Sequence, residues 1–242
     1  MTLCDARYYR YETDLARPVE AFIRTRLGPA DIAHELSFGR FAPDLVVGCR
    51  AETFHLRAEG QPPVCDAMML RLLDFLQDEG ASDTELRKWA PWGWRGLRRA
   101  LEPAVEAGLV YTRAGRWYAD PVANPYESLI AIELKLTDWR KGLVQARRNR
   151  GFASESWLVL ASDSPQEMQL TAAELGLGLL VASGTSFRKV VEAVPRPPLS
   201  PLDARFAAEL VFAQTLENGQ PGAQELRPLA GSPRGRKLAI AR

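Results

Sequence analysis

Apolar and polar positions along the chain follow helical and strand-like spacing in a regular order. A first helix is expected over residues 13–27, where large apolar side chains recur on one side. The later elements are, in chain order, strand-like runs at 32–38, 45–49 and 54–57 (the last extending the second), a strand at 129–136, a helix at 139–149, a strand at 157–161, a helix at 165–175, and strand-like runs at 178–182 and 189–194. This order is typical of an α/β protein with helices covering a central sheet in three layers.

Residues 60–120 break this order with a pattern of their own. Amphipathic spacing there predicts three helices, at about 67–77, 82–89 and 94–107, followed by a β-hairpin at 111–119. Three helices and a basic hairpin are the order of a winged helix, so we expect an inserted module.

The expected organisation is therefore discontinuous. Residues 1–59 and 121–195 form one core, residues 60–120 are inserted into it, and residues 196–242 make up a linker, one more helix and a mobile tail. The tail is rich in glycine, proline, serine and arginine, a composition that seldom buries enough apolar surface to become ordered.

The strand at 129–136 carries the most informative feature of the sequence. Apolar residues occupy both of its faces, as in a central strand, yet Glu133 and Lys135 project from the same side of it. Burying two charges in a sheet costs several kcal/mol unless pairing or a metal ion compensates. One interpretation is a simple ion pair at a frayed strand end. The other is a carboxylate metal ligand beside a lysine that stabilises charge during hydrolysis.

Composition limits the class of protein, its compartment and the kind of metal site that the sequence could form. A hydrophobic share of 46% and a charged share of 25% are ordinary for a globular protein, and no apolar run approaches the roughly 20 residues of a membrane span. Three cysteines without a CxxC pair indicate reduced thiols, and the start of the chain does not resemble a signal peptide. We therefore expect a cytoplasmic protein without a membrane partner. Two histidines and no HExxH motif argue against a histidine-built metal site.

Pro43-Asp44 precedes the strand before the insertion, and Glu133-Leu134-Lys135 lies in the strand after it. If the insertion interrupts a hairpin, Asp44 and Glu133 lie on adjacent strands. With this arrangement the chain resembles the PD-(D/E)XK nuclease superfamily, over about residues 12–58 and 128–194. The resemblance implies an α/β, restriction-endonuclease-like three-layer core with a mixed central sheet, interrupted here by the winged-helix-like module. The length of the insertion departs from the family's usual short separation.

The resemblance also implies roles for individual residues. Asp44 and Glu133 would bind Mg²⁺ or Mn²⁺, Lys135 would orient or activate water, and Gln145 would line the site from the following helix.

Some members of the superfamily add an acidic residue from the first helix. Glu12 and Glu20 are the two candidates here. Glu12 falls within the apolar stripe of that helix, whereas Glu20 lies about 80° away from it, so we favour Glu12. Glu12 can also be explained as an N-terminal carboxylate stabilised by the helix dipole.

A net charge of +1 gives no global sign of nucleic-acid binding, but basic residues cluster locally. The candidate DNA contacts are on the third helix and hairpin of the insert and on the helix at 139–149: Arg95, Arg98, Arg99, Arg113, Arg116, Arg140, Arg147 and Arg148. The alternative is that these clusters are solvated helix faces. Four tryptophans of the insert either stack on bases or close a small core: Trp89, Trp92, Trp94 and Trp117.

Together these features predict a metal-dependent DNA endonuclease whose insert engages the duplex. Two alternatives remain, namely an inactive nuclease-fold protein that binds DNA or regulates, and a winged-helix protein-interaction module on an inert scaffold. The joint presence of Asp44, Glu133 and Lys135 favours the enzyme, because a protein that needed only the fold would gain stability by losing these charges. The oligomeric state is open, and a homodimer is compatible with the sequence.

Overall fold

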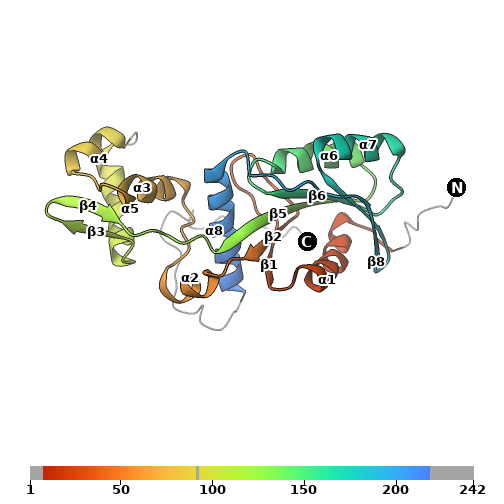
Figure 1. The fold of residues 1–242 in the computed structure, drawn as a ribbon, viewed down its shortest axis with the longest axis horizontal. Helices are drawn as coiled ribbons and strands as arrows, with labels where there is room; N and C mark the ends of the chain where they lie inside the picture. The colour runs from red at the N-terminus through yellow and green to blue at the C-terminus, as the bar shows by residue number, and fades with distance from the viewer. Residues whose placement is uncertain (1–7, 91–92, 219–242) are drawn as a thin grey trace.

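The computed structural model describes residues 8–90 and 93–218, which form a mixed α/β fold around a six-stranded sheet (Figure 1). The strands, in their order across the sheet, are β1 (Ala30–His34), β2 (Leu45–Arg50), β5 (Tyr126–Lys135), β6 (Glu155–Leu160), β7 (Gly178–Ser183) and β8 (Ser186–Val191). Strands β5, β6 and β7 are parallel, whereas the pairs β1–β2, β2–β5 and β7–β8 are antiparallel. The predicted α/β class with a mixed sheet is confirmed.

Helices cover both faces of this sheet. One face carries α6 (Trp139–Asn149), α7 (Gln166–Leu175) and α8 (Pro201–Glu217), and the other carries the 3-10 helix η1 (Glu12–Leu15) and α1 (Ala16–Leu27). Figure 1 shows α6 and α7 above the sheet and α1 below it. The helices predicted at 139–149 and 165–175 are confirmed to within a residue. None of the helices in residues 8–90 and 93–218 is long and apolar enough to cross a bilayer.

Strand β5 lies at the centre of the sheet between β2 and β6. All of its side chains from Leu129 to Lys135 are buried, because helices cover it on both sides. Ala131 packs toward α8, whereas Ile132 packs toward α1. Since side chains alternate along a strand, Glu133 and Lys135 lie on the same face as Ala131. The two charged residues are therefore enclosed between the sheet and its helices.

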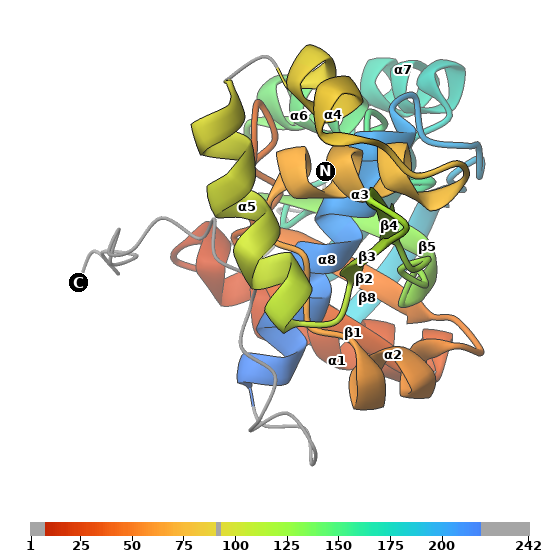
Figure 2. The same ribbon diagram turned by 90° about the vertical axis from the view of Figure 1, so that its left-hand side faces the viewer.

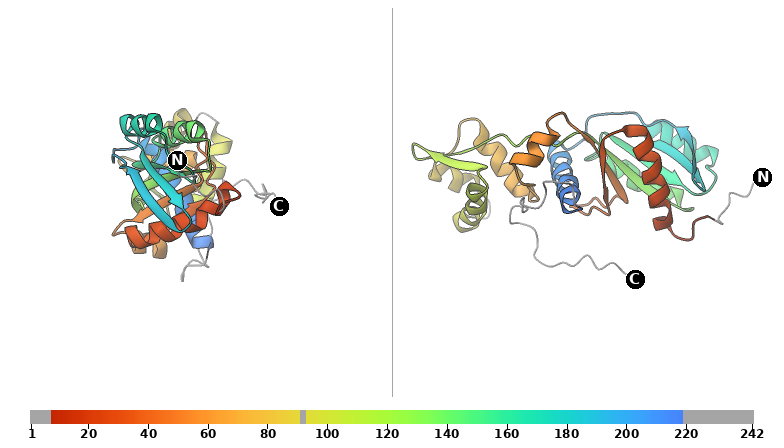
Figure 3. Two further views of the ribbon diagram at one scale, coloured as in Figure 1. Left: turned by 90° about the vertical axis from the view of Figure 1, so that its right-hand side faces the viewer. Right: turned by 90° about the horizontal axis from the view of Figure 1, so that it is seen from below.

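Between β2 and β5 the chain leaves the sheet and builds a second apolar core (Figures 2 and 3). The segment contains α2 (Phe54–Gly60), α3 (Ala67–Gln77), α4 (Asp83–Trp89), α5 (Trp94–Glu106), β3 (Val110–Arg113) and β4 (Arg116–Ala119). Leucines of α3, α4 and α5 pack with residues of the β3–β4 hairpin to form this core. The three helices and the hairpin predicted here are confirmed, and Pro103 lies in the last turn of α5 without ending it.

The outgoing and returning chains of this segment run side by side where β2 stops and β5 starts. Arg50 pairs with Tyr126 at the end of the ladder, and beyond it Arg57 Nε donates to Ala123 O at 3.1 Å. The β2–β5 pairing therefore reaches the point at which the insert leaves the sheet, with one shift of register between Cys49 and Arg50.

The prediction that residues 54–57 extend a strand is wrong. These residues form the first turn of α2. Phe54 packs edge-on against Phe212 of α8, and Arg57, three residues later, pairs with Glu209 of the same helix. A spacing of three residues puts both side chains on one face of a helix. An apolar run of four residues does not distinguish a strand from such a helix.

Helix α8 joins the two cores. Phe206 contacts both the core of the insert and the core beside the sheet. Arg57 Nη2 donates to Glu209 Oε2 at 2.6 Å, and the two side chains are 0% and 1% exposed. Glu209 Oε2 also accepts a hydrogen bond from Val64 N at 2.7 Å. Helix α8 is the one more helix expected within residues 196–242, whereas the mobile tail predicted beyond it lies outside the described residues.

Candidate active site

Charged side chains from three separate parts of the sequence meet at one edge of the sheet. Lys135 Nζ lies 3.3 Å from Glu12 Oε2, 3.5 Å from Asp44 Oδ2 and 3.8 Å from Glu133 Oε2. It also donates to Leu134 O at 2.7 Å. The structure thus brings together Glu12, Asp44, Glu133 and Lys135, which we call the carboxylate–lysine cluster.

Sheet pairing positions Asp44. This residue directly precedes β2, in which Leu45 pairs with Ile132 of β5. Continuing the antiparallel register by one residue puts Asp44 beside Glu133 and on the same face of the sheet. Leu134 N donates to Asp44 Oδ2 at 2.7 Å, which fixes this carboxylate against the end of β5.

Glu12 reaches the cluster because η1 begins at this residue. The carboxylate of Asp14 accepts two backbone N–H groups at the start of the turn and so caps it. Glu20, the alternative acid of the first helix, instead lies 2.8 Å from His34 Nε2. Both glutamates line the same cleft of about 360 Å³, but the one beside Lys135 is Glu12.

Glu133 is the most deeply enclosed member of the cluster, with 1% of its side chain exposed. Its Oε1 accepts a hydrogen bond from Asn149 Nδ2 at 2.7 Å, while its Oε2 has no hydrogen-bond partner among the described residues. Burial raises the pKa of Glu133 to about 7, and the nearby Asp44 carboxylate adds to the rise. The Asn149 amide and Lys135 oppose it. Glu133 therefore gives up its proton less readily than an exposed glutamate does.

Two residues of α6 that were not singled out from the sequence, Asn149 and Gly142, lie against members of the cluster. Asn149 of α6 is buried and orients the Glu133 carboxylate. Gly142 of the same helix faces the stem of Lys135, since a Cβ atom there would lie 3.0 Å from Lys135 Cγ and 2.7 Å from Leu158 Cδ1. The absent side chain lets α6 approach β5 closely. Only its spacing could have pointed to Asn149 in the sequence, because Asn149 follows the candidate Gln145 by one helical turn.

Gln145 itself is half-buried on α6. Its Oε1 is buried and has no hydrogen-bond partner in the described residues. The structure thus places Gln145 on the helix that covers the cluster, with an unused acceptor, but joins it to none of the four charged residues.

The cluster can be tested for its fit to a divalent cation. Asp44 and Glu133 present hard oxygen atoms of the kind that Mg²⁺ and Mn²⁺ prefer, and Glu133 Oε2 is an unused buried acceptor. Mg²⁺ is commonly held by one or two carboxylates, with water and substrate phosphates completing its shell. Residues 8–90 and 93–218 contain no group of three or more His, Cys, Asp or Glu residues arranged for a metal ion. Binding would therefore depend on this carboxylate pair together with water or substrate oxygens.

Most of the arginines predicted to contact DNA are exposed and unpaired. In the described part of the chain, no ion pair engages Arg95, Arg98, Arg99, Arg113, Arg147 or Arg148. Arg116 Nη1 lies 3.3 Å from Glu85 Oε2, and Arg140 Nη2 lies 3.3 Å from Glu167 Oε2. These two guanidinium groups are already partly neutralised within the chain.

The tryptophans of the insert serve mainly its own packing. Trp89, Trp94 and Trp117 are half-buried against the core of the insert. Trp117 Nε1 donates to Asp83 Oδ1 at 2.8 Å. This favours the core-closing interpretation for these three, while Trp92 lies outside the described residues.

Replacing Glu133 by Gln should stabilise the metal-free protein at alkaline pH. The folded-state pKa of about 7 lies above the ordinary value of 4.5, so the folded protein holds this proton more tightly than the unfolded chain does. The corresponding stability is complete below about pH 4.5 and is lost as the pH rises through 7, a loss of about 3 kcal/mol. Urea unfolding in EDTA should show Glu133→Gln more stable than wild type at pH 8, with no difference at pH 4.5. Equal stability at both pH values would contradict the burial of an uncompensated carboxylate.

Comparison of the chain with protein-family models, with curated proteins and with solved structures found no match in any of the three.

Proposed function

We propose that this chain is a metal-dependent DNA endonuclease of the PD-(D/E)XK type. The observation that carries the proposal is the convergence of Asp44, Glu133 and Lys135, with Lys135 Nζ at 3.5 and 3.8 Å from the two carboxylates. A mixed sheet covered by helices, with an aspartate at the start of β2 and Glu-x-Lys at the end of β5, supports a restriction-endonuclease-like core.

In this proposal Asp44 and Glu133 hold a divalent cation. When bound, the cation would polarise the scissile phosphate and lower the pKa of a water molecule. Lys135 stabilises the negative charge that develops during hydrolysis, and its burial strengthens this interaction because solvent screens it little. Asn149 donates to Glu133 Oε1, which leaves Oε2 available.

We further infer that α3 to β4 form a winged-helix-like module that binds the duplex. Helix α5, the third helix of the module, would serve as its recognition helix, and Arg95, Arg98 and Arg99 are exposed on it. Arg113, at the tip of the β3–β4 hairpin, is exposed as well. Unpaired guanidinium groups on a helix and a wing are suited to contact phosphates and base edges.

The insert and the carboxylate–lysine cluster lie at opposite ends of β5 (Figure 1). The insert returns to the sheet at Tyr126, whereas Lys135 ends the strand. This length of strand spans about 30 Å, the length of roughly nine base pairs. A duplex held by the insert would therefore run along the long axis of the molecule to reach the cluster, and shorter duplexes would not contact both.

Replacing Arg95, Arg98 and Arg99 together by alanine should weaken binding to all duplex sequences. Each lost phosphate contact should reduce the salt slope of log K by about 0.9, so we expect a flatter salt dependence. Fluorescence anisotropy on a labelled 25-base-pair duplex at several salt concentrations measures both quantities. A matched variant replaces the exposed Arg24, Arg188 and Arg196, which removes the same charge outside the insert.

If the first triple variant keeps wild-type affinity and salt slope, the insert is better explained as a protein-interaction module. The DNA path would then have to be sought along Arg140, Arg147 and Arg148. Cleavage at saturating DNA should survive in the triple variant, because these arginines lie outside the carboxylate–lysine cluster.

The proposed activity is tested by incubating the purified protein with circular duplex, single-stranded and branched DNA. Each substrate is combined with Mg²⁺, with Mn²⁺, or with EDTA. We expect hydrolysis of at least one DNA form with Mg²⁺ or Mn²⁺ and none with EDTA. DNA binding without hydrolysis under every condition would instead identify a non-catalytic DNA-binding protein, and the absence of both would leave the interaction-module alternative.

A further inference from the structure

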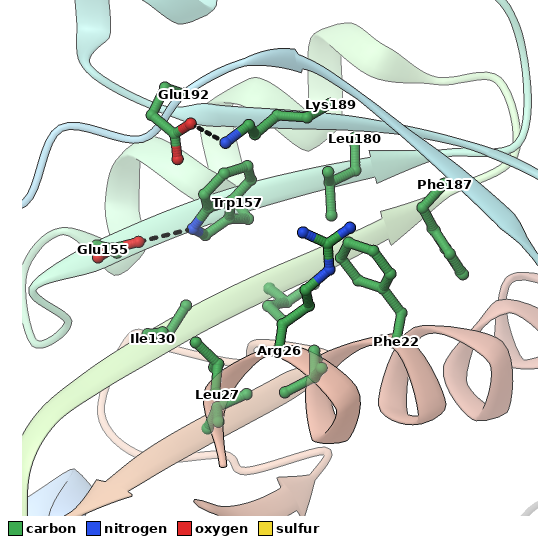
Figure 4. A pocket seen from close by; sticks show the side chains of 13 residues that line it. Phe22, Arg26, Leu27, Ile130, Glu155, Trp157, Leu180, Phe187, Lys189 and Glu192 are labelled. Atoms are coloured by element: carbon green, nitrogen blue, oxygen red, sulfur yellow. Dashed lines mark hydrogen bonds and ion pairs between the residues drawn. The ribbon is translucent and has the colours of Figure 1, made fainter.

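The face of the sheet that carries α1 is only partly covered, and a groove of about 440 Å³ remains open on it (Figure 4). In the described residues α1 is the only α-helix on this face. The floor of the groove consists of apolar side chains from neighbouring strands: Val47, Ile130, Ile132 and Leu180. Phe22, Ile23 and Leu27 of α1 form one wall, and Trp157 and Phe187 complete the apolar lining.

Trp157 is held as a fixed aromatic surface within this groove. Its Cα partner on β7 is Gly178, where a Cβ atom would lie 2.1 Å from the indole ring. The glycine therefore allows the ring to lie directly over β7. The indole Nε1 donates to Glu155 Oε2 at 3.0 Å, which satisfies its one polar group. A half-exposed tryptophan whose ring is held in this way offers a flat apolar surface without an unmet hydrogen bond.

Two cations and two carboxylates line the groove, but one of the cations, Arg26, pairs with neither carboxylate. Lys189 and Glu192 pair with each other, and Glu155 is bound to the indole. Arg26, which extends across the groove from α1, has no carboxylate partner in the described residues. Its guanidinium lies 5.3 Å from the centre of the Phe22 ring. An arginine of this kind is suited to a planar carboxylate or a similar anion.

We propose that this groove binds a small ligand with a flat apolar body and one anionic group. The apolar body lies on Trp157, and the anion pairs with Arg26. The volume falls in the range of about 300–1,000 Å³ that small-molecule pockets occupy, and a mostly apolar lining with few polar groups is their usual composition. This site is separate from the carboxylate–lysine cluster, although α1 lines both clefts, with Ala16 and Glu20 toward the cluster and Phe22 and Arg26 in the groove.

The probe for this proposal is 2-naphthoate, which combines a flat apolar body with one carboxylate. The 242-residue chain is titrated by calorimetry, and the indole N–H signal of Trp157 is followed by NMR and identified by its loss in Trp157→Phe. The neutral analogue 2-naphthamide serves as the matched ligand. Arg26→Gln is compared with Arg24→Gln, which changes an exposed arginine of the same helix that does not line the groove.

We expect 2-naphthoate to bind saturably with one molecule per chain and to shift the Trp157 signal. Arg26→Gln should weaken binding about tenfold, as should replacing the carboxylate by the amide, whereas Arg24→Gln should change nothing. The proposal is overturned if no saturable binding occurs, or if the Trp157 signal does not move. It is equally overturned if acid and amide bind alike and Arg26→Gln has no effect, since the groove would then be an unspecific apolar surface.

Discussion

Lys135→Ala is expected to lower DNA cleavage by about a thousandfold while leaving DNA affinity close to that of the wild type. Lys135 is 5% exposed, and its ammonium group is the one cation within 4 Å of Asp44 and Glu133 in the described residues. A group placed there acts on charge that develops during hydrolysis, so its loss should affect the rate rather than binding. Single-turnover cleavage and anisotropy on the same DNA measure the two effects separately.

The matched control is Lys141→Ala, which removes an exposed lysine from α6 close in sequence to the cluster. It should cleave at the wild-type rate. Because the loss of Lys135 leaves Glu133 without its nearest cation, the folding of Lys135→Ala is checked by thermal unfolding in the presence of Mn²⁺. Undiminished cleavage by a folded Lys135→Ala variant would exclude Lys135 from the reaction.

Arg57→Met should destabilise the protein by about 3–5 kcal/mol, the cost of leaving one partner of a buried ion pair alone. Glu209 would keep its hydrogen bond from Val64 N but would lose the only guanidinium that contacts it in the described residues. Ala123 O and Gln61 O would also lose the hydrogen bonds that Arg57 donates. Urea unfolding, compared at the same pH, measures the loss.

Two further variants make this prediction specific. Arg57→Met combined with Glu209→Leu should recover part of the lost stability, because no charge is then left buried. Arg140→Met, which breaks the exposed pair with Glu167, should leave stability unchanged within error. A loss below about 1 kcal/mol in Arg57→Met would show that α8 does not depend on this pair for its attachment to the insert.

The adjacency of Asp44 and Glu133 could be predicted from the sequence because it follows from strand pairing alone. An apolar strand on each side of an insertion indicates an interrupted hairpin, and the observed pairing of Leu45 with Ile132 puts the two acids side by side. The alternation of side chains along β5 then places Lys135 on the same face. The first helix was expected from residue 13, and Glu12 lies one residue before that start, in the separate 3-10 helix η1.

The remaining features depend on contacts between elements far apart in the chain. Asn149 orients Glu133 only because α6 packs closely over β5, and no local pattern reports that packing distance. The pairing of Glu209 with Arg57 was likewise not predictable, because the two residues are 152 positions apart in the sequence. A helix here was expected from the sequence, but α8 buries side chains on more than one side, and its contact with two cores through Phe206 was not predictable.

The assignment of a hydrolytic metal site depends above all on Asp44, whose carboxylate both contacts β5 and faces Lys135. Cleavage of circular duplex DNA with Mn²⁺ is therefore compared between wild type, Asp44→Asn and Asp163→Asn, an exposed aspartate with no hydrogen bond or ion pair in the described residues. We predict cleavage by wild type and Asp163→Asn, and its loss in Asp44→Asn. Equal cleavage by all three proteins would contradict the proposed site.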